Sequence, residues 1–321
     1  MIVWILLIIL GFVLLIKGAD FLVDGASNVA KKFHIPEIII GLTIVSIGTS
    51  MPELFVSITS ATRGSSDMAI GNVVGSNIAN LLLILGLSSV LMPVKFKKET
   101  RLIEMPLCLG ISIVFAIVCN IGKSVSRMDS SFLLILFALF IFYTIIMAKQ
   151  GEDFDKDDNE PSEDNSKVKT SNSTIRDIIF LVLGIVLLKV GGDLTVDNAV
   201  KVAQSFNLSE KIISVTILAI GTSLPELVTS VSAAIKGKSD IAIGNILGSN
   251  IFNMLLIIGV SSMINPITYN TSYNVDMIFL TIGVLLLALF PVIPPKNKMT
   301  RWNGIIYLYM YIAYMVSLFV R

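Results

Sequence analysis

Runs of about 20 apolar residues recur along the whole 321-residue chain, and this pattern constrains the fold more than any other feature. A helix of that length crosses the hydrocarbon core of a bilayer. Backbone amides find no water inside a bilayer, so only helices and closed barrels can span it. The chain is 54% hydrophobic and 15% charged, whereas about a quarter of the residues of a soluble domain are charged. The sequence therefore predicts an all-α membrane protein that crosses the bilayer repeatedly.

The apolar runs predict ten transmembrane helices. They lie near residues 2–28, 36–62, 67–92, 102–121, 128–148, 176–203, 210–235, 240–264, 274–293 and 302–320. No basic segment precedes the first run, so we interpret it as a span and not as a cleaved signal peptide. An acidic segment with Pro and Ser follows the fifth span and is typical of a flexible linker. The predicted organisation is a five-helix unit over 1–149, an acidic linker over 150–174 and a second five-helix unit over 175–321.

The chain contains one stretch twice, at a constant offset of 173 residues. Residues 41–93 and 214–266 align without a gap, and 30 of the 53 aligned positions are identical. Each copy places one glutamate, Glu53 or Glu226, in apolar sequence. A carboxylate at the centre of a membrane helix costs about 2.5–3.5 kcal/mol or more, so it is rare and usually functional. The duplicated carboxylates therefore predict a functional site.

Five spans per unit is an odd number, so the second unit enters the membrane in the opposite sense to the first. The prediction is two inverted-topology repeats of five helices, an arrangement typical of secondary transporters with a substrate site near the midplane. The repeat extends to the first and sixth spans, which carry DFLVDGA and DLTVDNA. Interfacial ion pairing with the nearby Lys17 and Lys189 is the favoured interpretation of their aspartates, which are Asp20, Asp24, Asp193 and Asp197.

The distribution of Lys and Arg predicts the orientation. The odd-numbered loops between the predicted spans hold 16 Lys and Arg residues, and the opposite side holds 6. Loops rich in Lys and Arg stay in the cytoplasm. We therefore expect a multi-pass protein of the cell membrane with both termini outside and the 150–174 linker in the cytoplasm.

The motifs GTSMPE and GTSLPE supply oxygen atoms suited to a cation. Pro52 and Pro225 each delete a helical hydrogen bond and crowd the carbonyl four residues earlier, which frees backbone carbonyls near Ser46 and Ala219. Hydroxyl groups come from the residues just before each glutamate, namely Thr49, Ser50, Thr222 and Ser223. An all-oxygen shell with two carboxylates suits a hard cation such as Ca²⁺ and offers nothing to a soft metal.

The GNxxGSNIxN segments predict the second half of each site. Ser76 and Asn80 stand four residues apart and therefore share one helix face, and Ser249 and Asn253 repeat this spacing. Polar side chains on one face of an apolar helix should point into the bundle. For the other asparagines the choice between ion binding and helix packing stays open; these are Asn72, Asn77, Asn245 and Asn250.

Other reactive residue types point to no further site. Cys108 and Cys119 lie in one apolar run without CxxC spacing, which favours buried small hydrophobes. His34 is the only histidine and cannot build a transition-metal site, so we interpret it as a solvated loop residue. The net charge is +1, without a basic patch that would suggest nucleic acid. We expect no cofactor, no enzymatic activity and no obligate protein partner; the lipid bilayer is the surrounding partner.

The paired GTSxPE and GSNIxN motifs resemble the α-repeats of the sodium/calcium exchanger family, within the wider cation/Ca²⁺ antiporters. The resemblance covers essentially the whole chain. It implies that the second, third, seventh and eighth helices surround the ions and that the first and sixth slide across them. By position, the implied ligands are the carbonyls of Ser46 and Ala219 and the side chains of Thr49, Ser50, Glu53, Ser76, Asn80, Thr222, Ser223, Glu226, Ser249 and Asn253. Asn253 departs from the archaeal and potassium-dependent members, which have Asp there, so potassium co-transport is not implied.

The resulting hypothesis is a secondary antiporter that exchanges Ca²⁺ for Na⁺ by alternating access at a midplane site. Two alternatives remain open at this point. In a H⁺/Ca²⁺ antiporter, Glu53 and Glu226 would take up protons in place of Na⁺. A cation channel, the less favoured alternative, would use the same oxygen-lined site without countertransport.

Overall fold

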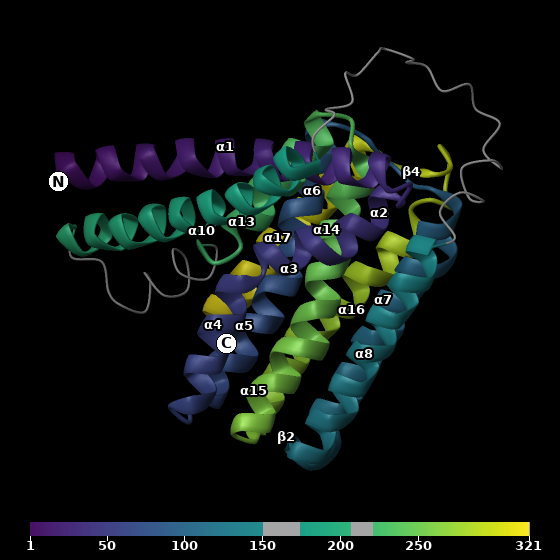
Figure 1. Ribbon diagram of the computed structural model, residues 1–321. Coiled ribbons are helices and arrows are strands. Elements are labelled where there is room, and N and C mark those ends of the chain that lie inside the picture. Colours follow the sequence, from purple (N-terminus) through teal and green to yellow (C-terminus); the bar gives the residue numbers. More distant parts are fainter. Residues whose placement is uncertain (150–173, 207–220, 321) are drawn as a thin grey trace.

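A computed structural model describes residues 1–149, 174–206 and 221–320 of the chain. Nearly all of these residues are helical (Figure 1). The ligand predicted at Ala219 and nearly all of the predicted linker lie outside the described residues.

The first half of the chain begins with one long helix and continues as shorter segments joined end to end. Its helices are α1 (Ile2–Lys32), α2 (Glu37–Ile40), η1 (Gly41–Val45), α3 (Ser46–Thr49), α4 (Met51–Thr62), α5 (Ser66–Ile78), η2 (Ala79–Leu85), α6 (Gly86–Leu91), η3 (Thr100–Glu104), α7 (Met105–Asn120), η4 (Ile121–Lys123) and α8 (Arg127–Lys149). Its two short strands are β1 (Val94–Lys95) and β2 (Ser124–Val125).

The second half repeats this order. Its helices are α10 (Thr174–Ser205), α13 (Leu224–Ile235), α14 (Ser239–Phe252), η6 (Asn253–Ile257), α15 (Ile258–Ile264), η7 (Thr271–Tyr273), α16 (Asn274–Leu289) and α17 (Arg301–Val320). Its strands are β3 (Ile267–Thr268) and β4 (Lys298–Met299). The predicted span boundaries agree with these helix ends to within a few residues wherever the chain is described.

The structure supports a multi-pass membrane protein. Within the described ranges, seven helices are long and apolar enough to cross a membrane, and the pair Glu37–Thr49 and Met51–Thr62, bent by 50°, forms an eighth candidate. The described part of the seventh predicted span, Leu224–Ile235, is shorter, and α17 is outside this set of candidates. The count of ten therefore remains a prediction.

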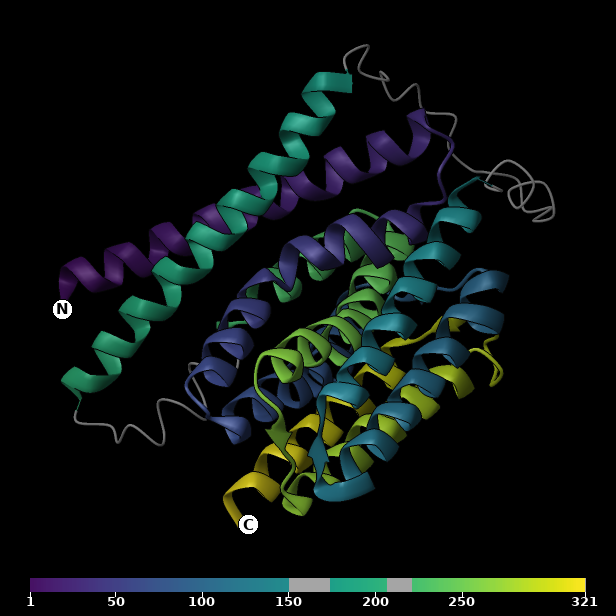
Figure 2. The ribbon, with the colours of Figure 1, turned by 60° about the horizontal axis from the view of Figure 1, so that its bottom comes forward.

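Helices α1 and α10 form a layer of their own along one side of the other helices (Figures 1 and 2). They run antiparallel, because Gly11 of α1 faces Gly191 of α10, whereas Gly18 faces Gly184. A Cβ atom built on Gly11 would lie 2.8 Å from the carbonyl oxygen of Gly191. The glycines therefore allow backbone-to-backbone packing, as small residues do in membrane helices generally.

The two GSN-containing helices lie at the centre of the remaining bundle. Every residue of α14 from Ile241 to Phe252 is buried. A π-helical turn begins at or next to the last asparagine of the GSNIxN motif in both halves. In the first half η2 starts at Ala79, one residue before Asn80, and in the second half η6 starts at Asn253. Such π-helical insertions are frequent at functional sites.

The loops gather at two opposite ends of the bundle. At one end β1 pairs antiparallel with β4, and Lys97 pairs with Asp240 at the start of α14 at 3.3 Å. At the other end β2 pairs antiparallel with β3. There the hydroxyl oxygen of Ser66, at the start of α5, lies 3.4 Å from the hydroxyl oxygen of Thr268. Helices α5 and α14 therefore begin at opposite ends of the bundle.

Candidate ion-binding site

The proline motifs break both helices at equivalent residues. Helices α4 and α13 each begin directly after a serine, Ser50 or Ser223, whose backbone angles are nearly the same (φ −84°, ψ 8° and φ −88°, ψ 8°). Each new helix carries proline in its first turn, where the missing N–H costs nothing. The breaks place Glu53 and Glu226 in the first turns of α4 and α13. The helix dipole favours a carboxylate at that position.

Each carboxylate is held by the serine of the other copy. The Ser50 hydroxyl donates to Glu226 Oε1 at 2.8 Å, and the Ser223 hydroxyl donates to Glu53 Oε1 at 3.2 Å. Both glutamates are 1% exposed. The two motifs, 173 residues apart in sequence, therefore form one buried centre.

The GSN segments complete this centre from α5 and α14. The Ser76 hydroxyl donates to Glu53 Oε1 at 3.4 Å. Asn80 Nδ2 donates to Asn250 Oδ1 at 3.1 Å, and Asn253 Nδ2 donates to Asn77 Oδ1 at 2.9 Å. These bonds use the amide N–H groups and leave the Asn80 and Asn253 carbonyl oxygens available.

Two threonines occupy equivalent positions but have different surroundings. The Thr49 hydroxyl lies 3.0 Å from Asn245 Oδ1 and 3.3 Å from the Ser46 carbonyl oxygen. The Ser46 carbonyl also accepts the Ser50 backbone N–H at 3.0 Å, so proline does not leave it unpaired. The Thr222 hydroxyl has no hydrogen-bond partner among the described residues. A cation bound at the Ser46 carbonyl would take the place of the Thr49 hydroxyl or share the oxygen with it.

The remaining asparagines tie helices together. Asn77 Nδ2 donates to the Asn250 carbonyl at 3.3 Å, and Asn250 Nδ2 returns a bond to the Asn77 carbonyl at 3.4 Å. Asn72 and Asn245 donate to serines of α4 and α13, which the sequence reasoning did not single out: Ser57 and Ser230, both at 2.9 Å. The 173-residue offset between these two serines is the signal that identifies them.

Unpartnered oxygens concentrate at this centre. Thirteen buried side-chain polar atoms of the described residues lack a hydrogen-bond partner, and six belong to the predicted ligands. They are Glu53 Oε2, Glu226 Oε2, Asn80 Oδ1, Asn253 Oδ1, Thr222 Oγ1 and Ser249 Oγ. Leaving such a group unsatisfied costs about 1–3 kcal/mol. The cluster is therefore built to receive something that binds oxygen. Within the described chain there is no group of three or more His, Cys, Asp and Glu side chains suited to a metal ion, so neutral oxygens must complete any shell.

A cavity of about 200 Å³ lies between α4, α10 and the start of α13. Pro52 and Phe55 line it from α4, Asp193 and Asp197 line it from α10, and Thr222 is also among its lining residues. Both aspartates are exposed. The cavity thus joins an acidic surface to one of the unpartnered site hydroxyls.

The aspartates of α1 and α10 form different ion pairs. Asp20 and Asp24 pair with Lys236, beyond the end of α13, at 3.0 and 2.8 Å. The expectation of Lys17 as their partner is therefore wrong, whereas Asp193 does pair with Lys189, at 2.7 Å. Burial on its own would lower the pKa of Lys236, but hydrogen bonds and charge from Asp24 and Asp20 outweigh it and raise the pKa. Lys236 is thus charged at neutral pH.

The two cysteines and the histidine lie where the sequence predicts them. Cys108 and Cys119 are free and buried, and His34 is exposed in a loop with φ 53°.

Comparison with known proteins agrees with this geometry. The profile of the sodium/calcium exchanger protein family matches residues 3–146 and again 177–320. The chain is 36% identical to the putative antiporter CaxA of Alkalimonas amylolytica, with 99% of each chain covered. It is 32% identical to the sodium/calcium exchanger MaX1 of Methanosarcina acetivorans, with 98% of each covered. A solved structure of the sodium-calcium exchanger NCX_Mj superposes with a TM-score of 0.84 at 33% identity, covering 99% of each chain.

The fold and the buried oxygen site define a membrane transporter, not an enzyme. The chain belongs to the sodium/calcium exchanger family.

Proposed function

We propose that this protein is an antiporter that exports Ca²⁺ against entering Na⁺, with each ion set binding in turn at the centre between α4, α5, α13 and α14. The observation that supports it most directly is the set of six unpartnered oxygens around Glu53 and Glu226. Carboxylate, amide and hydroxyl oxygens are the ligands that Ca²⁺ prefers. The other predicted ligands would contribute further oxygens to the Ca²⁺ or Na⁺ shells; they are Ser46, Thr49, Ser50, Ser76, Ser223 and Ala219.

The charge of the site suits exchange. Two glutamates neutralise Ca²⁺, so the loaded site is close to neutral when apolar helices pass it. Three Na⁺ on the same carboxylates would leave one positive charge to cross the membrane. The membrane potential would then contribute about 2.3 kcal/mol per 100 mV to each cycle. The cycle needs no cofactor.

Ten spans in two inverted repeats are the topology that we propose for this function. Helices α5 and α14 begin at opposite ends of the bundle, beside β3 and β1. The family profile matches each half separately, in agreement with repeats over 1–149 and 175–321 joined by the 150–174 linker. The reciprocal bonds between Asn77 and Asn250 are what two facing copies would produce.

We place this protein in the cell membrane with both termini outside and the linker in the cytoplasm. The loops at the β1·β4 end hold most of the Lys and Arg residues, including Lys95, Lys97 and Lys298, which supports a cytoplasmic location for that end. Single cysteines at Lys97 and Ser162 should be labelled from the cytoplasm, and one at Lys123 from outside. The reverse pattern would invert the orientation.

Alternating access would use the two corners where α1 and α10 meet the site helices. At the cytoplasmic corner, α1 is held against α13 by Lys236, Asp20 and Asp24. At the outer corner, the cavity separates α10 from α4. These contacts support an outward-open state in which the two ion pairs of Lys236 close the cytoplasmic side.

The opposite state would exchange the two arrangements. Subtracting 173 from Lys236 gives Arg63, and the same offset relates Asp20 and Asp24 to Asp193 and Asp197. Arg63 has no ion-pair partner among the described residues. In the inward-open state we expect Arg63 to pair with Asp193 and Asp197 while Lys236 is released.

The decisive experiment compares counter-ions. Purified protein in proteoliposomes is loaded with Na⁺, K⁺, Li⁺ or acid, and ⁴⁵Ca²⁺ uptake is followed after dilution into buffer without that ion. Uptake that requires outward Na⁺ supports the proposal. Uptake of equal rate in every gradient would overturn it.

H⁺/Ca²⁺ exchange is the second candidate. Glu53 Oε2 and Glu226 Oε2 are buried and have no hydrogen-bond partner among the described residues, so they could carry protons instead of holding a cation. Uptake driven by a pH step in the complete absence of Na⁺ would favour this candidate. A unitary conductance in planar bilayers would favour a channel instead.

A further inference from the structure

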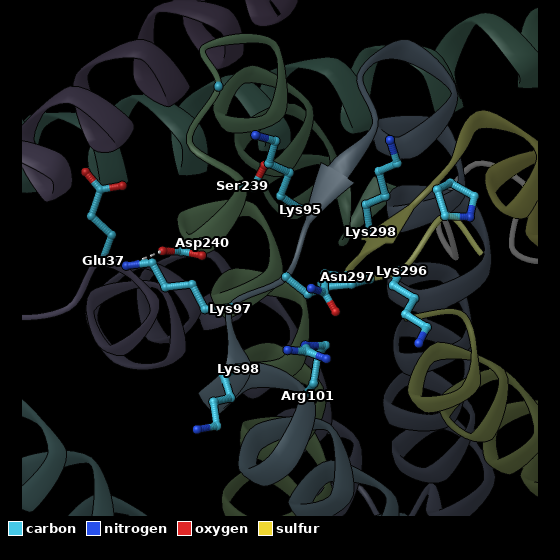
Figure 3. A pocket seen from close by; sticks show the side chains of 13 residues that line it. Glu37, Lys95, Lys97, Lys98, Arg101, Ser239, Asp240, Lys296, Asn297 and Lys298 are labelled. Carbon is cyan, nitrogen blue, oxygen red and sulfur yellow. Dashed lines mark ion pairs between the residues drawn. The ribbon is translucent and has the colours of Figure 1, made fainter. Parts of the chain in front are cut away.

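A second cavity lies at the β1·β4 end of the bundle, and its lining is basic, whereas the candidate ion site is acidic. It has a volume of about 780 Å³, and Figure 3 shows the charged side chains that line it. Two are acidic, Glu37 and Asp240, and six are basic: Lys95, Lys97, Lys98, Arg101, Lys296 and Lys298. A cavity with this excess of positive charge attracts anions.

Both carboxylates of the cavity already have cationic partners. Asp240 pairs with Lys97 at 3.3 Å. Glu37 pairs with Lys238 at 3.1 Å and also accepts the Ser27 hydroxyl at 2.6 Å. Across the described ranges, the five other cations that line the cavity have no ion-pair partner; they are Lys95, Lys98, Arg101, Lys296 and Lys298.

The backbone holds some of these cations together against their repulsion. The register of β1 and β4 sets Lys95 directly opposite Lys298, an arrangement that destabilises a strand pair unless an anion balances it. The Phe96 N–H donates to the Asn297 carbonyl at 2.8 Å, and Asn297 has the left-handed φ of 64°. The loop from the C-terminal half is therefore fixed against the loop from the first half.

Arg101 adds a buried donor to this frame. Its guanidinium lies near Asn297 in Figure 3. The Nε atom is buried and has no hydrogen-bond partner in the described part of the chain. A guanidinium offers paired N–H groups that match phosphate geometry, so this donor favours a phosphate over a carboxylate or chloride.

Exposed apolar side chains flank the basic residues in sequence. Leu102 is next to Arg101, Ile293 lies in the loop before Lys296, and Trp302 is the second residue of α17; their exposed fractions are 63%, 56% and 75%. Tryptophan is enriched where membrane helices meet the headgroup layer. Apolar side chains exposed beside basic ones are typical of the level where membrane helices meet the headgroups.

We propose that this cavity binds the phosphate of an anionic phospholipid headgroup from the cytoplasmic leaflet. Basic pockets between transmembrane helices on this side recognise such headgroups. The lipid would bridge β1 and β4 and so hold the first and second halves together at one end. The inference is independent of which cation is exchanged.

Trp302 provides a direct probe of this binding. Trp4 and Trp302 are the only tryptophans, so Trp4→Phe leaves one reporter. The protein is placed in phosphatidylcholine vesicles in which a fixed fraction of lipid is replaced by brominated phosphatidylglycerol or by brominated phosphatidylcholine. Bromine quenches tryptophan on contact, and we expect stronger quenching by the anionic lipid.

A charge-matched comparison locates the effect. Lys95→Gln, Arg101→Gln and Lys298→Gln together should reduce the preference for the anionic lipid roughly tenfold or more. The control replaces three cations at the same end but outside the cavity, Lys31, Lys32 and Lys149, by Gln and should keep the preference. Lys95→Arg with Lys298→Arg should also keep it, which distinguishes lost charge from misfolding.

Two outcomes would overturn the proposal. An equal loss in the cavity and control variants would show attraction to the whole basic surface. The second outcome concerns a soluble ligand, tested by titrating glycerol 3-phosphate onto protein in pure phosphatidylcholine. A saturable change in Trp302 emission, without any excess quenching by brominated phosphatidylglycerol, would assign the cavity to soluble phosphates.

Discussion

Two corners of the molecule have equivalent sequences and different structures. At one, Lys236 joins Asp20 and Asp24 of α1 at 3.0 and 2.8 Å. At the other, Asp193 turns back to Lys189 in its own helix, and a cavity separates α10 from α4. The same motif is thus closed in one half and open in the other.

Under the alternating-access mechanism that we propose, this difference means that the repeat encodes two states and that the structure represents the outward-open one. If both corners were closed, no ion could reach the site, and if both were open, the ions would cross freely. An asymmetric pair of symmetric corners is what alternating access requires. The comparison predicts which substitutions should act equally in the two halves and which should act in opposite directions.

The largest effect should come from the carboxylates, where the two halves are equal. Glu53→Gln and Glu226→Gln each remove half of the charge that balances a desolvated Ca²⁺. By analogy with breaking a buried ion pair, at about 3–5 kcal/mol, transport should fall roughly a hundredfold or more. Na⁺-dependent ⁴⁵Ca²⁺ uptake, normalised to purified protein, measures the loss.

Glu104 provides the control for this prediction. Glu104 is also 1% exposed, and its Oε2 has no hydrogen-bond partner among the described residues. Its Oε1 accepts the Tyr143 hydroxyl outside the site. Glu104→Gln should keep most of the exchange activity. Near-normal exchange in either site variant would place the ions elsewhere.

A smaller effect should follow from opening the closed corner. Lys236→Gln removes two partly exposed ion pairs, together about 0.5–1 kcal/mol, and should shift the population toward the inward-open state about two- to fivefold. A cysteine at Val196, which lines the cavity between α4 and α10, should then be labelled correspondingly more slowly from outside. Native Cys108 and Cys119 are buried and should not interfere.

The matched control is Lys238→Gln. Lys238 lies two residues further along and pairs with Glu37, not with α1. It should leave the labelling rate unchanged. An equal decrease in both variants would mean that the loop, and not the ion pair with α1, determines the state.

Arg63→Gln should act in the opposite direction and less strongly. In this structure Arg63 has no ion pair among the described residues, so its loss should destabilise only the proposed inward-open state. Added to Lys236→Gln, it should restore labelling at Val196 toward the original rate. If Arg63→Gln alone slowed labelling of the cysteine at Val196, Arg63 would not be the counterpart of Lys236 in the other state.

The smallest effect concerns the amide corners. Asn253→Asp adds a third carboxylate, and it replaces the N–H that Asn253 donates to Asn77 Oδ1 at 2.9 Å. The carboxyl cluster should then take up a proton near neutral pH as one coupled system. Exchange should decline at a higher pH than in the native protein, and Asn80→Asp should behave alike.

Flux profiles between about pH 5.5 and 8.5, each scaled to its maximum, test this. Coincident profiles for the native protein and Asn253→Asp would show that the Asn253 side chain does not face the ions.

The sequence was sufficient wherever a physical constraint acted locally. Pro52 and Pro225 must interrupt a helix, and both helices restart just before them. The spacing of Ser76 and Asn80 requires a common face, and both residues are buried. These features depend on backbone chemistry within a few residues, which is visible in the chain itself.

What the sequence could not supply depends on distant partners. Lys17 is near Asp20 in sequence, but the ion pair forms with Lys236, more than two hundred residues away. The difference between the corners is also absent from the repeat, because equivalent residues give equivalent expectations. Likewise, the cations of residues 95–101 and 296–298 line one cavity because β1 pairs with β4, and this pairing is not visible in the sequence.

The glycine contacts between α1 and α10 bear on the efficiency of energy conversion. A Cβ on Gly184 would lie 2.7 Å from the Leu22 backbone nitrogen, and one on Gly18 would lie 2.8 Å from that of Leu188. Helices packed so closely cannot slide separately, so in the proposed cycle closure on one side and opening on the other would be a single event. Each entering Na⁺ would then cross while the opposite path is shut. Loosening this contact would let the sodium gradient dissipate as uncoupled leak, with heat as its only product.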